Sequence, residues 1–123
     1  MLECFIFSAF DIRIVDGGQT WGRVEIQHLG VWGHACAGEW SSVEATVVCR
    51  MKGFAGGVVF GTKHTPDKVA WVSGLKCTGK ETSLKECKSS SWWQPVFWCP
   101  AVSVLCYKTE GLYACTVLTR CFC

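Results

Sequence analysis

Asparagine is absent from this chain of 123 residues, so the sequence offers no acceptor for N-glycosylation. No segment approaches the ~20 consecutive apolar residues that a membrane-spanning helix needs. No Cys-x-x-Cys pair occurs, and His28, His34 and His64 do not have the spacing of a zinc finger. These absences argue against a transmembrane helix and against a structural zinc site.

Catalytic motifs are also lacking. The chain has no Gly-x-Ser-x-Gly elbow, no His-Glu-x-x-His and no phosphate-binding loop. His34 lies two residues before Cys36, a spacing that suggests a thiol–imidazole pair. A cysteine in a disulfide has no free thiolate, however, and cannot act as a nucleophile. We therefore expect no enzyme activity in this chain.

Ten cysteines stand out among the residues that are present. Cytosolic thiols are kept reduced, so this number indicates an oxidising compartment outside the cytosol. Hydrophobic residues make up 50% of the chain and include seven Trp, which argues against disorder and favours one domain with a real core. The net charge of +2 is too small to predict binding to nucleic acid.

The residue pattern predicts more strands than helices. In the segment 22–27, Val24 and Ile26 point to one side and the polar Arg23 and Glu25 to the other, which is typical of a half-buried strand. The other strands are expected at 11–15, 31–35, 56–61, 69–72 with a continuation at 75–77, and 101–107. The turn between the second and third strands makes them a hairpin.

One helix is predicted to begin after Ser41. Ser41 and Glu44 have the spacing of a capping box, in which each side chain binds a free backbone N–H of the first turn. Val43, Val47 and Met51 recur every four residues and form an apolar stripe. Gly53 is placed to end the helix, and a short helical turn is expected at 82–86. The fold class is therefore α+β.

The chain is expected to divide into an apolar lead (1–10), a domain (11–107) and a cysteine-rich tail (108–123). The lead carries Glu3 and lacks the basic start of a secretory signal peptide. Four cysteines lie in these two end segments: Cys4, Cys115, Cys121 and Cys123. A disulfide between the lead and the tail is an open alternative for them.

Several motifs occur in an order that is typical of one family. They are RIVDGG (13–18), GRVEI (22–26), WG-x-x-C (32–36), W (40), VVCR (47–50) and L-x-C-x-G-x-E-x-SL-x-x-C (75–87). The segment 12–106 thereby resembles a scavenger receptor cysteine-rich (SRCR) domain. The resemblance implies a curved antiparallel sheet that cradles one helix and is stapled by disulfides.

The resemblance is to the six-cysteine class of that family. The additional pair of the eight-cysteine class has no counterpart here, since no cysteine stands near Thr20 or at Phe54. By resemblance, the bridges are Cys36–Cys99, Cys49–Cys106 and Cys77–Cys87. The spacing of the cysteines by itself leaves the pairing open.

Family members often bind polyanions or proteins through a cation site made of acidic residues. The corresponding positions here carry no carboxylate: Ala37, Gly38, Ser73, Gly74 and the segment 100–105. Glu39 and Glu81 remain, but calcium prefers several hard oxygen ligands that include carboxylates. We therefore expect no metal site and no cofactor.

Two groups of residues are candidates for contact with a ligand. A face that collected the lysines of one third of the chain would attract polyanions in a salt-sensitive manner. These lysines are Lys63, Lys68, Lys76, Lys80, Lys85 and Lys88. Trp92 and Trp93 would add aromatic contacts if their loop is exposed, whereas Trp98 is expected to pack over a disulfide. The alternative is that the lysines are ordinary solvated surface.

The predicted function is that of an extracellular, non-catalytic binding module of the scavenger-receptor type. Its ligand would be a protein or a polyanion, with no specific binding to nucleic acid and with membrane attachment only through a parent chain. One alternative is an accessory domain of a larger secreted protein, such as a protease or a lysyl-oxidase-like enzyme. Another is a degenerate fragment without its own ligand. The oligomeric state is left open.

Overall fold

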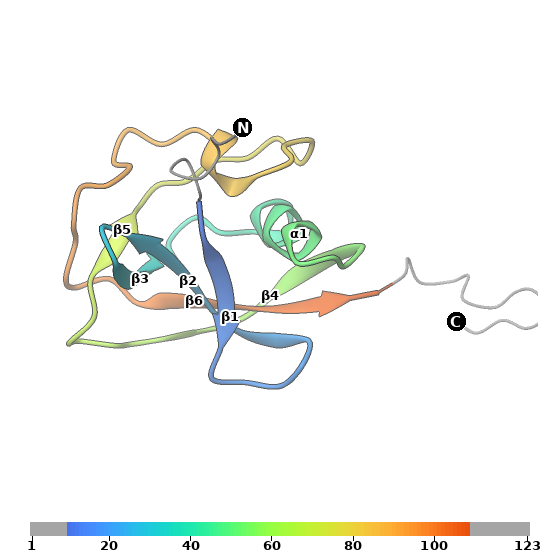
Figure 1. Ribbon diagram of the computed structural model, residues 1–123, viewed down its shortest axis with the longest axis horizontal. Helices are drawn as coiled ribbons and strands as arrows, with labels where there is room; N and C mark the ends of the chain where they lie inside the picture. The colour runs from blue at the N-terminus through green and yellow to red at the C-terminus, as the bar shows by residue number, and fades with distance from the viewer. Residues whose placement is uncertain (1–9, 109–123) are drawn as a thin grey trace, which may run out of the picture.

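The structure is a computed structural model that describes residues 10–108 (Figure 1). Within this range six strands form one curved sheet, which wraps around the helix α1 (Ser42–Met51). The strands are β1 (Ile12–Val15), β2 (Trp21–His28), β3 (Val31–Ala35), β4 (Gly56–Lys63), β5 (Ala70–Val72) and β6 (Ala101–Tyr107). A short 3-10 helix, η2 (Leu84–Glu86), lies between the last two strands. The predicted α+β class is confirmed.

The order of the strands in the sheet is β4-β6-β2-β3-β5, and β1 pairs with β2 outside this path. Each of these pairs is antiparallel except β3 with β5, which is parallel. A parallel pair needs a long connection between its strands, and α1 and β4 lie in the connection from β3 to β5. The sheet is therefore mixed at one edge, whereas the resemblance implied an antiparallel sheet.

The hairpin of β2 and β3 turns on Leu29 and Gly30. Both residues have positive φ angles, of 55° and 77°. Positive φ at both central residues defines a type I′ turn, whose twist matches that of the two strands. This turn sets the register that places Glu25 opposite His34.

Helix α1 begins as predicted. Ser41 is the N-cap residue, and the reciprocal hydrogen bonds of the capping box with Glu44 are both present. The helix ends before Gly53, whose φ of 91° is readily available to glycine alone. The predicted apolar stripe is wrong at its first position: Val43 is 36% exposed, while Val47 is fully buried.

The core lies between α1 and the concave face of the sheet. Its fully buried side chains include Val24 and Ile26 of β2, Val48 of α1, and Val104 of β6. Strand β4 is longer than predicted and reaches Lys63. The strand expected at 75–77 is reduced to a single bridge, between Lys76 and Lys88.

The polar side of β2 differs from the prediction of a half-exposed strand. Glu25 is fully buried and Arg23 is 6% exposed. The Glu25 carboxylate accepts hydrogen bonds from Arg13 at 2.7 Å and from Arg23 at 2.8 Å. Arg23 also donates to Asp16 at 2.6 Å. Alternation identified the two faces of the strand correctly, but it could not show that the second face is also covered.

Three disulfides cross-link the fold. They join Cys36 to Cys99, Cys49 to Cys106 and Cys77 to Cys87, which are the pairs that the resemblance implies. The four cysteines of the lead and the tail lie outside the described residues, as does the proposed disulfide between them. No helix within residues 10–108 is long and apolar enough to cross a bilayer.

Candidate ligand-binding surface

The residues from Lys76 to Lys88 form a closed loop, here called the lysine loop. The disulfide Cys77–Cys87 joins its ends. Outside the disulfide, the backbones of Lys76 and Lys88 exchange two hydrogen bonds of 2.9 Å. The two ends of the loop are therefore fixed both covalently and by backbone pairing.

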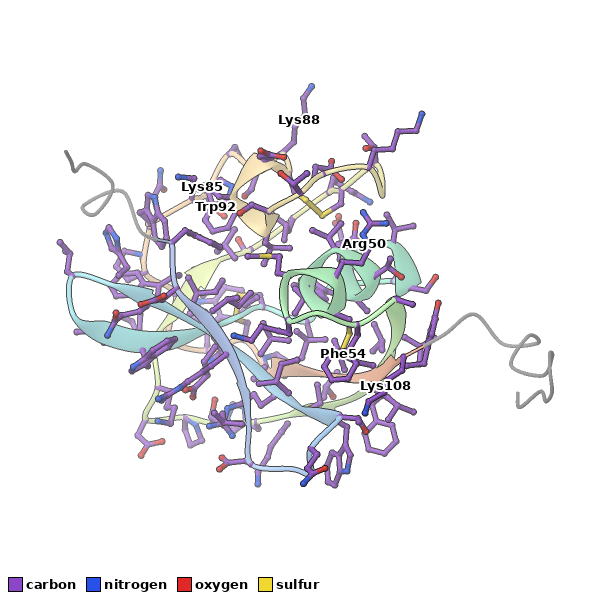
Figure 2. All side chains as sticks on the ribbon, turned by 45° about the vertical axis from the view of Figure 1, so that its right-hand side comes forward. Arg50, Phe54, Lys85, Lys88, Trp92 and Lys108 are labelled. Carbon is purple, nitrogen blue, oxygen red and sulfur yellow. A yellow bond between two sulfur atoms is a disulfide. The ribbon has the colours of Figure 1, made fainter. Side chains whose placement is uncertain are left out.

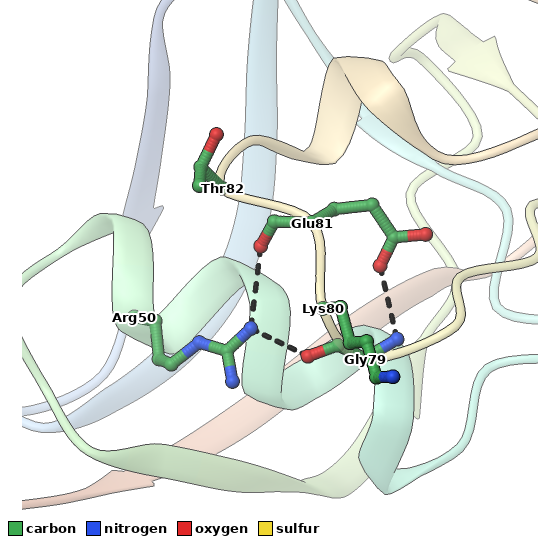
Figure 3. A pocket seen from close by; sticks show the side chains of 5 residues that line it. All are labelled: Arg50, Gly79, Lys80, Glu81 and Thr82. Carbon is green, nitrogen blue, oxygen red and sulfur yellow. Dashed lines mark hydrogen bonds between the residues drawn. The ribbon is translucent and has the colours of Figure 1, made fainter.

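Three side chains of helix α1 form hydrogen bonds with the backbone of the lysine loop. Glu44 accepts a hydrogen bond from the backbone N–H of Cys77 at 2.9 Å. Arg50 donates from Nη2 to the carbonyl oxygens of Gly79 at 2.6 Å and of Glu81 at 3.2 Å (Figure 3). Met51 accepts from the N–H of Leu84 through its sulfur. The residues that build the helix thus also set the conformation of the loop.

Burial and hydrogen bonding act in opposite directions on Glu44. Burial raises the pKa of this carboxyl, but hydrogen bonds from Cys77 and Ser41 outweigh burial and lower the pKa below its ordinary value of 4.5. Glu44 is therefore ionised at neutral pH. It caps the helix and ties the loop to it at the same time.

Glutamates inside the lysine loop bind its own backbone. Glu81 accepts hydrogen bonds from the N–H groups of Thr78 at 2.8 Å and Gly79 at 2.9 Å, which lower the pKa of its carboxyl. Glu86 accepts from the N–H of Thr82 at 3.0 Å. Each carboxylate binds the backbone of the loop itself, and the loop carries four lysines against these two glutamates.

Lys76, Lys80, Lys85 and Lys88 are all exposed on this rigid loop. Figure 2 shows Lys88 and Lys85 extending away from the body of the protein at the end that lies above α1. Lys76 and Lys88 are directly opposite each other in their backbone pair, so their side chains share one side of it. Lys76 also lies 3.3 Å from Glu39, and both side chains of this pair are more than half exposed.

The other two predicted lysines lie elsewhere. Lys63 ends β4 opposite Ala101, and the Lys68 ammonium is 3.9 Å from the buried Glu25. Figure 1 shows their segment along the bottom of the sheet, on the far side from the lysine loop. The structure therefore brings four of the six candidate lysines together and separates the remaining two.

Trp92, Trp93 and Trp98 differ in how far their side chains are buried. Trp92 donates from its indole N–H to the carbonyl of Cys87, and Trp93 stacks on His28 with 4.0 Å between ring centroids. Both rings are partly buried against the core. The packing predicted for Trp98 is wrong: this side chain is 77% exposed. Phe97, directly before it, is 61% exposed as well, since both residues lie in a bend at the surface and not in a strand.

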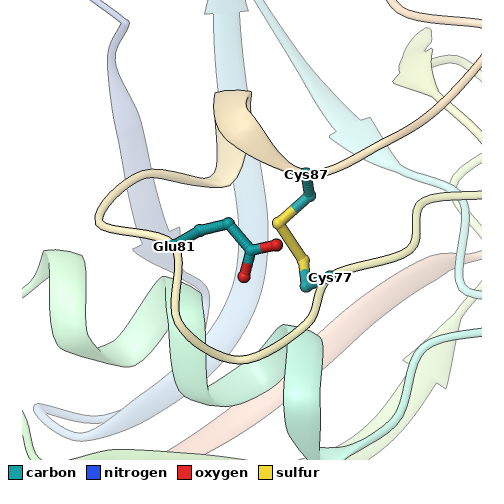
Figure 4. A group of neighbouring side chains, drawn as sticks. All are labelled: Cys77, Glu81 and Cys87. Carbon is teal, nitrogen blue, oxygen red and sulfur yellow. A yellow bond between two sulfur atoms is a disulfide. The ribbon is translucent and has the colours of Figure 1, made fainter.

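One group of side chains lies close enough together to suggest a metal site: Cys77, Glu81 and Cys87 (Figure 4). The two sulfurs are bonded to each other, and metal ligation by cysteine needs a free thiolate. The Glu81 carboxylate is occupied by backbone N–H groups. Glu39 is paired with Lys76 instead of other acids. These donors do not fit a calcium ion.

A buried histidine, His34, lies on the other face of the sheet, and its burial was not predicted from the sequence. His34 is fully buried. Its Nε2 is 3.0 Å from the carbonyl oxygen of Cys99 and its Nδ1 is 3.3 Å from the hydroxyl of Thr65. A carbonyl can only accept, so Nε2 carries the proton and Nδ1 accepts from Thr65. Burial is the main cause that lowers the pKa of His34 below its ordinary value of 6.5.

This burial predicts a dependence of stability on pH. The unfolded chain takes up a proton at His34 near pH 6.5 while the folded protein does not, so the free energy of unfolding should fall as the pH drops below about 6.5. Urea unfolding at a series of pH values between 7.5 and about 5 would measure this slope. In the variant His34→Gln the slope should be shallower. An equal slope in both proteins would show that His34 is not responsible.

Comparison with known proteins identifies the family of this chain. The family model of the scavenger receptor cysteine-rich domain matches residues 16–107. The chain belongs to this family. Family membership and three disulfides place this SRCR domain outside the cell, as predicted. SRCR domains are generally non-catalytic receptor modules, which agrees with the expected absence of enzyme activity.

Curated relatives include two proteins named for receptor or binding functions. Galectin-3-binding protein of Bos taurus is 40% identical over 89 residues, which cover 67% of this chain and 16% of that protein. The macrophage receptor MARCO of Mus musculus is 35% identical over 81 residues, which cover 66% of this chain and 15% of that protein. The SRCR domain described here thus spans about one sixth of the length of these relatives.

Solved structures support the fold. The SRCR domain of mouse MARCO in its dimeric form has a TM-score of 0.63 and 31% identity, covering 75% of this chain and 91% of that chain. The third SRCR domain of murine neurotrypsin has a TM-score of 0.64 and 30% identity, covering 83% of this chain and all of that chain. The curved sheet around one helix is therefore the fold of the family.

Proposed function

We propose that this SRCR domain is an extracellular, non-catalytic module that binds polyanions through the lysine loop. The observation that carries the proposal is the rigid presentation of four exposed lysines by a loop that the helix and a disulfide hold in place. A rigid backbone lowers the conformational entropy lost on binding.

Removing the four lysine charges tests this proposal. The variant Lys76→Gln/Lys80→Gln/Lys85→Gln/Lys88→Gln should bind immobilised dextran sulfate at least about tenfold more weakly, because exposed charges attract a polyanion additively. Binding of the unchanged protein should weaken as sodium chloride rises, because salt screens such contacts. Surface plasmon resonance at several salt concentrations measures both effects.

The matched control is Lys63→Gln/Lys68→Gln, which removes two lysines from the far side of the sheet. It should bind nearly as well as the unchanged protein. An equal loss of binding free energy per lysine in the two variants would mean that general positive charge, and not the lysine loop, attracts the ligand. Because the available donors do not fit calcium, a chelator such as EDTA should leave binding unchanged.

A second candidate function is that of an accessory domain that positions other domains of a larger secreted protein. The match covers only 15–16% of the length of these relatives, which favours this alternative. This alternative predicts that the folded protein binds no polyanion at any salt concentration, which distinguishes it from the first proposal.

A further inference from the structure

The two most exposed aromatic side chains of residues 10–108 are neighbours in the chain. Trp98 is 77% exposed and Phe97 is 61% exposed. Both lie in a bend of the chain just before β6, residues 97–100, here called the aromatic bend. Large aromatic side chains that adjoin each other in solvent are typical of a surface that contacts a partner.

The backbone of the aromatic bend is fixed. Directly before it, Val96 and Ala70 of β5 exchange two backbone hydrogen bonds, of 2.7 Å and 3.0 Å. Within it, Cys99 is joined by a disulfide to Cys36. The two exposed rings are therefore carried by a backbone that loses little conformational entropy when they bind.

A basic segment, residues 63–68, lies beside the aromatic bend. Lys63 is exposed and pairs with the first residue of β6, which follows the bend directly. The buried His34 contacts both segments, through the carbonyl oxygen of Cys99 and the hydroxyl of Thr65. Figure 1 shows the two segments at the left edge of the molecule. The basic segment contains two lysines and one aspartate, so its charge is positive.

This combination of side chains suits a lipid surface better than a protein. A stable protein interface needs about 800 Å² on each partner, whereas the apolar part of this surface consists of two neighbouring side chains. A bilayer requires less apolar area, because each ring that enters it is transferred from water into an apolar environment. Tryptophan is enriched at the interface of membrane and water, and nearby lysines are attracted to anionic head groups.

We propose that the aromatic bend inserts Phe97 and Trp98 into the surface of a membrane that contains anionic lipids, while the basic segment contacts the head groups. The contact is peripheral and is separate from any attachment through a parent chain. It does not involve the lysine loop, so the inference goes beyond the proposed function and does not depend on it.

The test measures binding to vesicles in a background that lacks the charges of the lysine loop, Lys76→Gln/Lys80→Gln/Lys85→Gln/Lys88→Gln. This protein should still sediment with vesicles of phosphatidylcholine that contain about 30% phosphatidylserine. Adding Phe97→Ser/Trp98→Ser should lower the partition coefficient at least about tenfold, because two rings no longer leave water. Vesicles of phosphatidylcholine alone should bind the background protein at least about fivefold more weakly, since they do not attract the lysines.

The matched control adds Val58→Ser/Phe60→Ser to the same background. These side chains are 40% and 53% exposed, and Val58 pairs with Leu105, toward the end of β6 that is away from the bend. The control should bind the anionic vesicles as well as the background protein does. Circular dichroism checks that each variant is folded.

Three results would overturn the inference. The folded background protein could fail to bind anionic vesicles, which would favour a protein as the partner of the aromatic bend. The two pairs of serine substitutions could weaken binding equally, or neutral vesicles could bind as tightly as anionic ones. None of these results bears on the proposed function, which the binding of dextran sulfate to the lysine loop tests separately.

Discussion

Replacing Cys49 and Cys106 together by alanine is expected to lower the free energy of unfolding by about 4 kcal/mol. This disulfide joins α1 to β6 across 57 residues of sequence, and both cysteines are buried in the core. A cross-link over a long loop removes many conformations from the unfolded chain, and its loss restores them. Urea unfolding without reductant, followed by tryptophan fluorescence, measures the difference.

The variant Cys77→Ala/Cys87→Ala is the control for loop length. Its disulfide spans only 10 residues, for which the same relation gives about 3 kcal/mol. The hydrogen bonds from Glu44 and Arg50 still hold this loop when the disulfide is absent. A greater loss of stability in this variant than in Cys49→Ala/Cys106→Ala would contradict the explanation by chain entropy.

Replacing Glu25 by alanine is expected to cost about 3–5 kcal/mol of stability. Glu25 is fully buried and accepts hydrogen bonds from Arg13 and from the nearly buried Arg23. Without the carboxylate, Arg23 keeps only Asp16 as an acidic partner, and Asp16 is mostly exposed. A buried cation that has lost its main partner destabilises the folded state strongly. Chemical unfolding at pH 7 measures the loss.

Glu39→Ala is the matched control, since Glu39 is also a carboxylate paired with a lysine but is 57% exposed. Its effect should be below about 1 kcal/mol, because solvent screens exposed ion pairs. Similar losses in the two variants would show that burial of Glu25 does not matter.

The pH dependence offers an independent test of Glu25. Burial raises the pKa of Glu25, but hydrogen bonds from Arg23 and Arg13 outweigh burial and lower it below 4.5. The stability that the ionised carboxylate contributes is therefore present above about pH 4.5 and is lost as the pH falls further. In Glu25→Ala the decrease of stability below that pH should be smaller than in the unchanged protein.

Short-range sequence signals predicted several elements correctly. The capping box of Ser41 and Glu44 and the helix end at Gly53 depend on residues within one or two turns. The hairpin turn at Leu29 and Gly30 is equally local. The pairing of the six cysteines is a different case, because spacing left it open and the resemblance to the SRCR family supplied it.

The candidate surface was predicted only in part. The sequence located the lysines but not their distribution, because Lys63 and Lys68 are near the other four in sequence and on the opposite side of the sheet in space. It also gave no signal that Arg50 binds the lysine loop, since 29 positions separate Arg50 from Gly79 and only the packing of the loop on α1 brings them together.

By itself, the sequence determined the helix, the hairpin, the oxidising compartment and the family, because each depends on neighbouring residues or on the order of motifs. Only the tertiary structure decided that Glu25 is buried and that Trp98 is exposed. Alternation along a strand shows which residues share a face, but whether a face meets solvent depends on segments that are distant in sequence. For the same reason, only the folded chain shows which lysines can contact one ligand.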